Sequence, residues 1–148
     1  MGKFTLNVFI NRSQQDVFDF LSNPANLSKW NSNFKSAEWA SSGAPGVGSI
    51  YKGLGRMPGK NNIEAQFEIT QWDPPNCYGY KTNMRIFPAE GFASVITLAP
   101  KEGGTQLTFE SHFKLIGVFK FAEGLFAKMG EKGDGKNFET AKQLLEAG

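Results

Sequence analysis

The chain has 148 residues, with 16 Lys and Arg against 14 Asp and Glu, which leaves a formal net charge of +2 at pH 7. This length fits one domain, residues 1–148, with a core of useful size. The basic residues are balanced by acidic ones and are not clustered, so the composition argues against nucleic acid as a partner. Fourteen phenylalanines indicate a large aromatic interior, with room for a lined cavity.

The single cysteine, Cys77, leaves no partner for an intrachain disulfide, so we expect a reducing, cytoplasmic compartment. No apolar run reaches transmembrane length, and the N-terminus lacks the apolar core of a secretion signal. We therefore expect no stable membrane insertion. One histidine and one cysteine do not supply a usual metal ligand set, and nothing in the sequence calls for a cofactor.

The first thirty residues predict a strand followed by two short helices. Lys3–Ile10 alternates apolar and polar residues, as a strand with one buried face does. Ser13 stands three residues before Asp16, an approximate capping box that opens a helix. Asn23 and Pro24 then provide the cap and the first residue of a second short helix.

Six further strands are expected, separated by segments rich in Gly, Pro and Asn. The short links predict antiparallel pairing, with one face of the sheet on a core and the other in water. Two of the links also make candidate gates for a cavity mouth, Met57–Asn61 and Arg85–Gly91. The predicted strands are Phe34–Ala40, Gly48–Arg56, Asn62–Trp72, Cys77–Met84, Phe92–Ala99 and Gln106–Leu115.

The last thirty residues carry two apolar stripes at helical spacing. The first begins at Val118 and includes Leu125 and Met129, and the second begins at Phe138. On a straight helix the two stripes lie roughly 120° apart. Three glycines stand between them, and each costs about 0.5–1 kcal/mol in a helix interior. We therefore expect a kink, bulge or unwound turn at Gly130–Gly135, which lets both stripes face the sheet.

Several stretches resemble one known superfamily, and together they cover nearly the whole chain. They comprise an opening strand with a capped helix, a glycine in the second hairpin, a strand ending in Asp-Pro-Pro, a Gly-Thr entry to the last strand, and the closing helix. The stretches are Phe9–Leu21, Gly46–Ser49, Phe67–Pro75, Gly103–Phe109 and Lys136–Glu146. They are similar to the START-related helix-grip superfamily (SRPBCC proteins), which includes polyketide cyclase/dehydrase-like proteins, plant pathogenesis-related class 10 proteins and lipid-transfer START domains.

This resemblance implies an α+β helix-grip fold. A curved antiparallel sheet of about seven strands would wrap around the long C-terminal helix, with an apolar cavity between the two layers. The element order would be one strand, two helices, six strands and the long helix. Combined with the strand alternation, the resemblance implies a ligand-binding set composed of Tyr51, Phe67, Ile69, Tyr78, Tyr80, Phe92, Ser94, Phe109, Ser111, Leu125, Phe126 and Met129.

The three tyrosines of this set are its most informative members. Their hydroxyls either orient a carbonyl or hydroxyl of a ligand, or bond to neighbouring serines and water as core residues do. No residue is assigned a catalytic role. His112 falls on the water-facing side of its strand, and Cys77 has no basic activator nearby in the sequence. Arg56 and Arg85, near strand ends, are the only candidates for a charged group at the cavity.

Three functions are consistent with these features. The first is a carrier or sensor that binds a lipid, a polyketide or an aromatic compound. The second is a metal-free cyclase, aromatase or dehydratase acting on polyketides, which rests on the resemblance and would need a desolvated acid or base in the cavity. The third is a co-chaperone-like interaction module with a filled cavity and an apolar outer patch. Both a monomer and a homodimer remain open.

Overall fold

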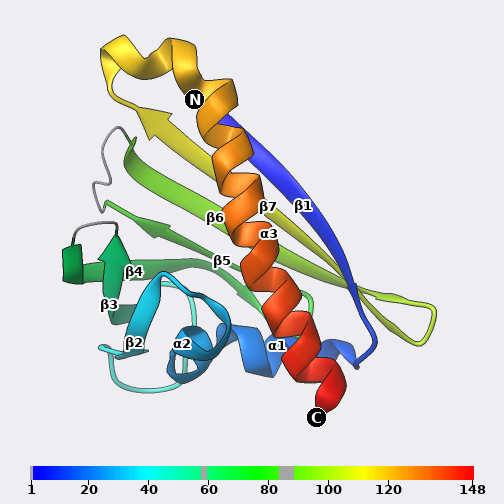
Figure 1. Cartoon of the computed structure of the whole chain (residues 1–148). Helices are drawn as coiled ribbons and strands as arrows, with labels where there is room; N and C mark the ends of the chain where they lie inside the picture. Colours follow the sequence, from blue (N-terminus) through cyan, green and yellow to red (C-terminus); the bar gives the residue numbers. More distant parts are fainter. Residues whose placement is uncertain (1, 58–59, 84–88) are drawn as a thin grey trace.

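The computed structural model describes residues 2–57, 60–83 and 89–148 of the chain (Figure 1). Within these residues seven strands form a single antiparallel sheet in the spatial order β1-β7-β6-β5-β4-β3-β2. The strands are β1 (Gly2–Ile10), β2 (Phe34–Trp39), β3 (Ile50–Met57), β4 (Lys60–Asp73), β5 (Cys77–Thr82), β6 (Ala89–Lys101) and β7 (Gly104–Leu115). The helical segments are α1 (Gln14–Ser22), η1 (Pro24–Asn26), α2 (Leu27–Trp30), η2 (Gly117–Ala122) and α3 (Glu123–Ala147).

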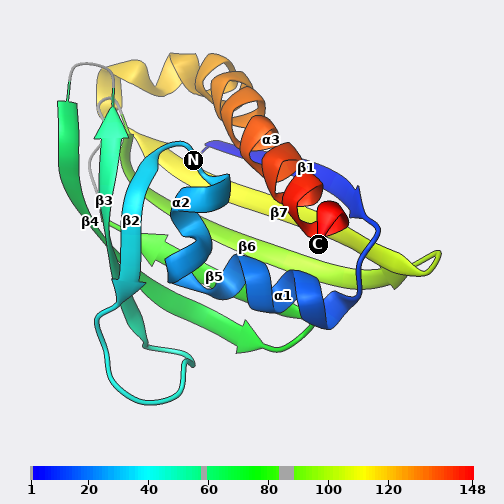
Figure 2. The same cartoon turned by 60° about the horizontal axis from the view of Figure 1, so that its bottom comes forward.

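The sheet curves around α1, α2 and α3, which lie against its inner face (Figure 2). The long helix α3 runs diagonally along β1 and β7, and α1 and α2 cover the part of the sheet near the C-terminus of α3 (Figures 1 and 2). This arrangement confirms the predicted α+β helix-grip fold. It follows from the sequence because strands with one apolar face need a second layer to cover that face.

The two short helices begin where the capping residues predict. The Ser13 hydroxyl accepts a hydrogen bond from the Asp16 amide at 3.1 Å, and the Asn23 side-chain oxygen accepts one from the Ala25 amide at 3.0 Å. Each bond satisfies an amide that the first turn of a helix leaves without a partner. The buried side of α1 consists of Val17, Phe18 and Leu21.

The strand register places two serines in the middle of the inner face. The five neighbouring strands β1, β7, β6, β5 and β4 each contribute one residue to a row of directly paired residues. The side chains of such a row point to the same side of the sheet. The row is Phe4, Ser111, Ser94, Tyr80 and Ile69. Its two central side chains are small, so the row leaves space beneath the helix that larger residues would fill.

The predicted interruption of the C-terminal helix is wrong. Helix α3 is α-helical from Glu123 to Ala147, and the irregular segment is instead the 3₁₀ helix η2 that precedes it. An interruption would be needed only if both apolar stripes faced the sheet. Leu125 and Met129 of the first stripe are 66% and 64% exposed. A single straight helix can therefore bury the second stripe alone.

Gly130 has a packing role inside α3. A Cβ atom built on this glycine would lie 2.5 Å from a ring carbon of Phe4 on β1, far inside the van der Waals distance. The absence of a side chain thus lets the helix approach the first strand closely, which offsets the cost of glycine in a helix. Nothing lies within 4 Å of the corresponding positions on Gly133 and Gly135.

Strand boundaries differ from the predictions mainly in β6. This strand begins at Ala89, before the predicted start at Phe92, and extends to Lys101. The two candidate gates at the cavity mouth, Met57–Asn61 and Arg85–Gly91, lie partly outside the described residues, because positions 58–59 and 84–88 are not among them.

Candidate functional site

An aromatic cavity of about 350 Å³ lies between the inner face of the sheet and α3. Strands β2 to β7, the turn after α2 and one residue of α3 contribute to its wall. The lining residues are Asn31, Asn33, Phe34, Gly55, Arg56, Ile63, Phe67, Tyr80, Thr82, Phe92, Ser94, Phe109, Ser111 and Asp134. Six of them belong to the twelve residues of the predicted binding set, namely Phe67, Tyr80, Phe92, Ser94, Phe109 and Ser111.

Three more residues of that set line a smaller void beside the cavity. This void measures about 40 Å³ and is walled partly by Tyr51, Ile69 and Tyr78. Phe67 and Tyr80 line both spaces, as do Asn31 and Phe34, so the void adjoins the cavity. The rings of Tyr51 and Phe67 are stacked, with centroids 4.9 Å apart, which packs this end of the inner face with aromatic rings.

The three helix residues of the predicted set do not line the cavity. Leu125 and Met129 are exposed, and their expected place at the ligand is corrected accordingly. Phe126 is half-buried against the ring of Phe113, at a centroid distance of 4.9 Å, and lines neither space. The helical contribution to the cavity comes from Asp134 instead.

Neutral hydroxyl groups form the polar centre of the cavity. Ser94 donates a hydrogen bond to the Ser111 hydroxyl at 3.2 Å, and both residues are buried. Burial raises the pKa of Tyr80, the charge of Asp134 raises it further, and the neighbouring Ser94 hydroxyl opposes the shift. Tyr80 is therefore uncharged at neutral pH and presents a hydroxyl that can donate or accept a hydrogen bond.

Asp134 is the main functional candidate that the sequence analysis missed. It is half-buried, and burial raises the pKa of its carboxyl group to about 6, with the Asn137 side chain acting in the opposite direction. No basic side chain in the described part of the chain forms an ion pair with it. A carboxyl group of this kind changes charge close to neutral pH and can accept or release a proton there.

Helical spacing is the signal that could have found this residue. Asp134 stands four residues before Phe138 and seven before Ala141, both buried, so it continues their stripe. The flanking glycines, Gly133 and Gly135, hide the pattern because they carry no apolar side chain.

A buried asparagine attaches α3 to the turn after α2, beside the cavity. The side-chain oxygen of Asn137 accepts hydrogen bonds from the Ser32 amide at 3.2 Å and from the Ser32 hydroxyl at 3.3 Å. Its amide nitrogen donates to the side-chain oxygen of Asn31 at 3.2 Å. These bonds join α3 to the cavity-lining residue Asn31 and help to hold Asp134, one turn earlier, in place.

The remaining candidates for chemistry lie away from the cavity centre. Arg56 lines the cavity with an exposed side chain, and Arg85 is outside the described residues. His112 lies on the outer face, with its Nε2 atom 2.7 Å from a carboxylate oxygen of Glu110. Burial raises the pKa of the Cys77 thiol, which disfavours the reactive thiolate. Across residues 2–57, 60–83 and 89–148 there is no cluster of three His, Cys, Asp or Glu side chains that could hold a metal ion.

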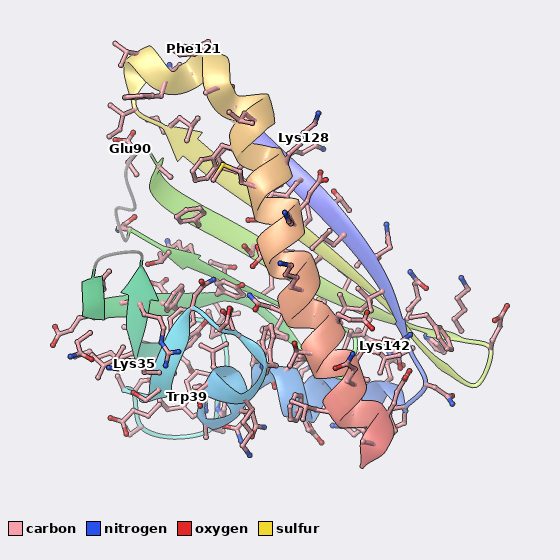
Figure 3. All side chains as sticks on the ribbon, in the orientation of Figure 1. Lys35, Trp39, Glu90, Phe121, Lys128 and Lys142 are labelled. Carbon is pink, nitrogen blue, oxygen red and sulfur yellow. The ribbon has the colours of Figure 1, made fainter. Side chains whose placement is uncertain are left out.

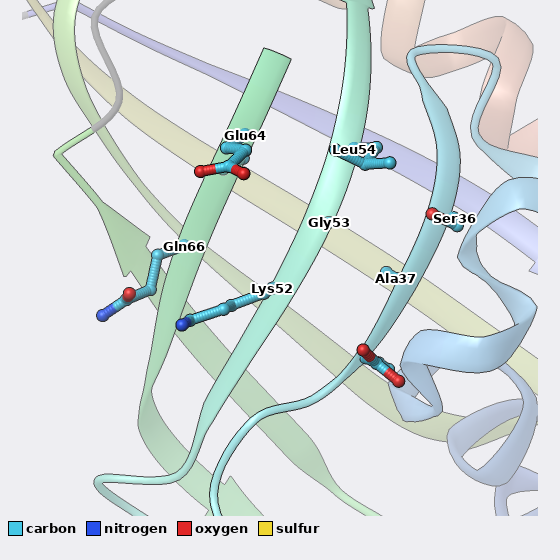
Figure 4. A pocket seen from close by; sticks show the side chains of 9 residues that line it. Ser36, Ala37, Lys52, Gly53, Leu54, Glu64 and Gln66 are labelled. Carbon is cyan, nitrogen blue, oxygen red and sulfur yellow. The ribbon is translucent and has the colours of Figure 1, made fainter. Parts of the chain in front are cut away.

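A larger hollow of about 620 Å³ lies on the outer face of β2, β3 and β4, where Lys52, Leu54, Glu64 and Gln66 extend from the strands (Figure 4). All four side chains are exposed, so water solvates the polar groups of this groove. The inner cavity is the stronger candidate, because it combines an apolar wall with a few buried polar groups, as small-molecule sites do.

Comparison with known protein families decides the classification of this chain. The family described as "Polyketide cyclase / dehydrase and lipid transport" matches residues 1–146. The chain belongs to this family. No curated protein sequence matches this member of the polyketide cyclase/dehydrase family significantly. None of the helices in the described residues is both long and apolar enough to cross a bilayer.

Several solved structures are similar to this polyketide cyclase/dehydrase family member over almost its whole length. Ara h 8.0201 matches with a TM-score of 0.77 and 16% identity, over 99% of this chain and 98% of that one. A protein of Thermus thermophilus matches with a TM-score of 0.77 and 14% identity, over 98% and 97%. The di-domain ARO/CYC protein StfQ, from the steffimycin biosynthetic pathway, matches with a TM-score of 0.81 and 12% identity, over 98% of this chain and 50% of StfQ. At these identities the similarity establishes the fold alone.

Proposed function

We propose that this protein is a carrier or sensor that binds a hydrophobic small molecule, such as a lipid, a polyketide or an aromatic compound, in the cavity between the sheet and α3. The observation that carries the proposal is the aromatic cavity of about 350 Å³ with a hydrogen-bonded serine pair at its centre. This volume falls within the range of about 300–1,000 Å³ that is usual for ligand pockets. The family assignment supports the same class of ligand.

The wall of the cavity has the properties that such a ligand requires. Phe67, Phe92 and Phe109 present apolar ring surface, and burial of that surface against a ligand is favourable at roughly 25 cal/mol per Å². Phe109 also packs on Phe4 and Phe138, at centroid distances of 5.9 and 4.9 Å, so the wall is supported from both layers. The few polar groups at the centre can orient a carbonyl or hydroxyl of the ligand.

A cavity-filling variant tests this proposal. Ser111→Leu places a branched apolar side chain in the centre of the cavity, and we expect it to weaken binding of the neutral dye Nile red by roughly tenfold or more. Thr97→Leu introduces the same side chain at an exposed position on the outer face of β6 and serves as the matched control. Fluorescence titration measures binding, and thermal unfolding shows that both variants are folded. Equal binding by folded Ser111→Leu and wild-type protein would place the site elsewhere.

A second candidate function is proton-transfer catalysis of the cyclase or dehydratase type. The observation that favours it is the Asp134 carboxyl group, since burial brings its pKa to about 6, near the value that a general base needs at neutral pH. A short aromatic β-keto thioester in deuterated buffer provides the test. For a catalyst we expect protein-dependent deuterium exchange at the acidic carbon, lost in Asp134→Asn. Exchange no faster than in buffer alone would exclude this reaction for that class of substrate.

A further inference from the structure

The charge distribution around the cavity is asymmetric. Among the described lining residues, only Arg56 from β3 and Asp134 from α3 carry a formal charge, and Tyr80 from β5 is the only other titratable group. Strands β4, β6 and β7 contribute neutral side chains alone. Arg56 has an exposed side chain, so water screens its charge, whereas Asp134 is half-buried and makes no ion pair with a described basic residue.

The surrounding protein only partly offsets the negative charge of a carboxylate in this position. Among the described residues, the polar group that favours its ionised form is the neutral side chain of Asn137, which also bonds to Ser32 and Asn31. A negative charge that is partly removed from water interacts strongly with any cation brought beside it, because the local dielectric constant is low. The space that such a cation would occupy is inside the cavity, since Asp134 lines it.

The other groups around the cavity also suit a cation. The rings of Phe67, Phe92 and Phe109 line the cavity. The face of an aromatic ring carries a negative electrostatic potential, which attracts an ammonium group within about 6 Å. The hydroxyls of Ser94 and Ser111 have acceptor lone pairs, as does the Tyr80 hydroxyl, which stays neutral because burial raises its pKa. The carboxylate of Asp134 and these oxygens line the same cavity, so acceptor groups for an ammonium ligand come from both the helix and the sheet.

We propose that the ligand of this cavity is an amphipathic amine, with an aromatic or aliphatic body against the phenylalanine wall and a protonated nitrogen paired with Asp134. This inference rests on the proposed binding function and specifies the chemical class of the ligand. It assigns Asp134 the role of a binding residue that selects positively charged ligands over neutral ligands of the same shape.

The proposal has a defined pH dependence. The pKa of Asp134 is raised to about 6, so the carboxyl group is mostly ionised at pH 7.5 and mostly protonated at pH 5. A primary alkylamine, with a pKa of about 10, stays protonated over this whole range. Amine affinity should therefore fall as the pH is lowered through about 6, while the affinity of a neutral analogue stays constant.

Three probes with the same aromatic body separate the possibilities. Naphthylethylamine, naphthylethanol and naphthylacetate carry a cationic, a neutral and an anionic end, and intrinsic naphthalene fluorescence reports the binding of each. At pH 7.5 we expect the amine to bind the wild-type protein at least about tenfold more tightly than the alcohol, and the anion to bind most weakly.

Two isosteric substitutions on α3 provide the decisive comparison. Asp134→Asn should weaken amine binding by roughly tenfold, leave alcohol binding within about twofold, and abolish the pH dependence. Glu131→Gln removes the same charge from an exposed position on the same helix and should change nothing. If the alcohol binds as well as the amine, or if Asp134→Asn leaves the preference intact, the inference is wrong while the binding function stands. If none of the probes binds, the proposed function itself fails.

Discussion

The two halves of α3 contain similar numbers of apolar residues but lie in opposite environments. In the C-terminal half, Phe138 is 2% exposed and Ala141 is fully buried. In the N-terminal half, Leu125 and Met129 are more than half exposed. Figure 3 shows Phe121, in the segment that precedes α3, at the end of the molecule farthest from the C-terminus. An apolar stripe therefore identifies which residues share a side of a helix, but not which side the sheet will cover.

Polar contacts reinforce this difference. Arg12, in the link between β1 and α1, donates hydrogen bonds to the carbonyl groups of Leu145 and Gly148, which the end of the helix leaves without internal partners. Lys142 donates to the carbonyl oxygen of Phe9 at 2.7 Å. The C-terminal half of α3 is thus held by burial and by hydrogen bonds. Asp134, which lines the cavity, lies near the boundary between this half and the more exposed N-terminal half.

The largest effect that separates the two halves should come from their apolar side chains. We expect Phe138→Ala to lower the free energy of unfolding by about 3–5 kcal/mol, because it removes a ring that packs on Trp30 and Phe109 and leaves a cavity. Leu125→Ala, the matched substitution in the other half, should change it by less than about 0.5 kcal/mol. Urea denaturation measures both, and similar losses for the two variants would contradict the comparison.

The second effect concerns the side-chain hydrogen bonds that attach the buried, C-terminal half of α3 to the rest of the protein. Asn137→Ala removes hydrogen bonds to Ser32 and Asn31 and should cost about 1–3 kcal/mol of unfolding free energy. Thr140→Ala, one turn along the exposed side of α3, is the control and should cost only a few tenths of a kcal/mol. A loss in Asn137→Ala no greater than in the control would show that these bonds do not hold the helix.

The third effect is a destabilisation of the folded protein by one of its own residues, Asp134. The pKa of Asp134 is raised to about 6 in the folded protein, against about 3.9 in an unfolded chain, so the folded state binds more protons between these values. The contribution of Asp134 to the free energy of unfolding is therefore most favourable below about pH 4, and it is lost as the pH rises through about 6. With allowance for partial exposure, the loss is about 1–2 kcal/mol at neutral pH.

Asp134→Asn tests this linkage directly. At pH 7 the variant should be more stable than the wild type by about 1–2 kcal/mol, and its unfolding free energy should be flatter between about pH 4 and 6. Chemical denaturation at several pH values measures the difference, with Glu131→Gln as the control for removal of a charge. A variant that is less stable at pH 7 would mean that the ionised carboxylate is stabilised in the fold. A residue that destabilises the folded state is a candidate functional residue, because function rather than stability then explains its presence.

The sequence predicted the strands and their inner faces well, since period-two alternation around Phe67 and Phe109 directly reports which side chains share a face. Six residues of the cavity wall were predicted by combining this alternation with the cavity that the family resemblance implies. The sequence misplaced Leu125 and Met129 because helical periodicity does not say which stripe is covered. Asp134 was missed because an acidic residue between glycines breaks the apolar pattern, although its spacing to the buried residues places it on their side.

The smallest expected effect concerns the exposed stripe, whose members are Val118, Phe121, Leu125 and Met129. An exposed apolar stripe is what the interaction-module hypothesis requires, whereas the open cavity favours ligand binding. The double variant Leu125→Ser, Met129→Ser should change the unfolding free energy by no more than about 0.5 kcal/mol per site and leave Nile red binding unchanged, because these side chains are mostly exposed and do not line the cavity. A marked loss of stability or of dye binding would show that this half of α3 closes over the sheet in solution, and the two halves would then differ much less than the structure indicates.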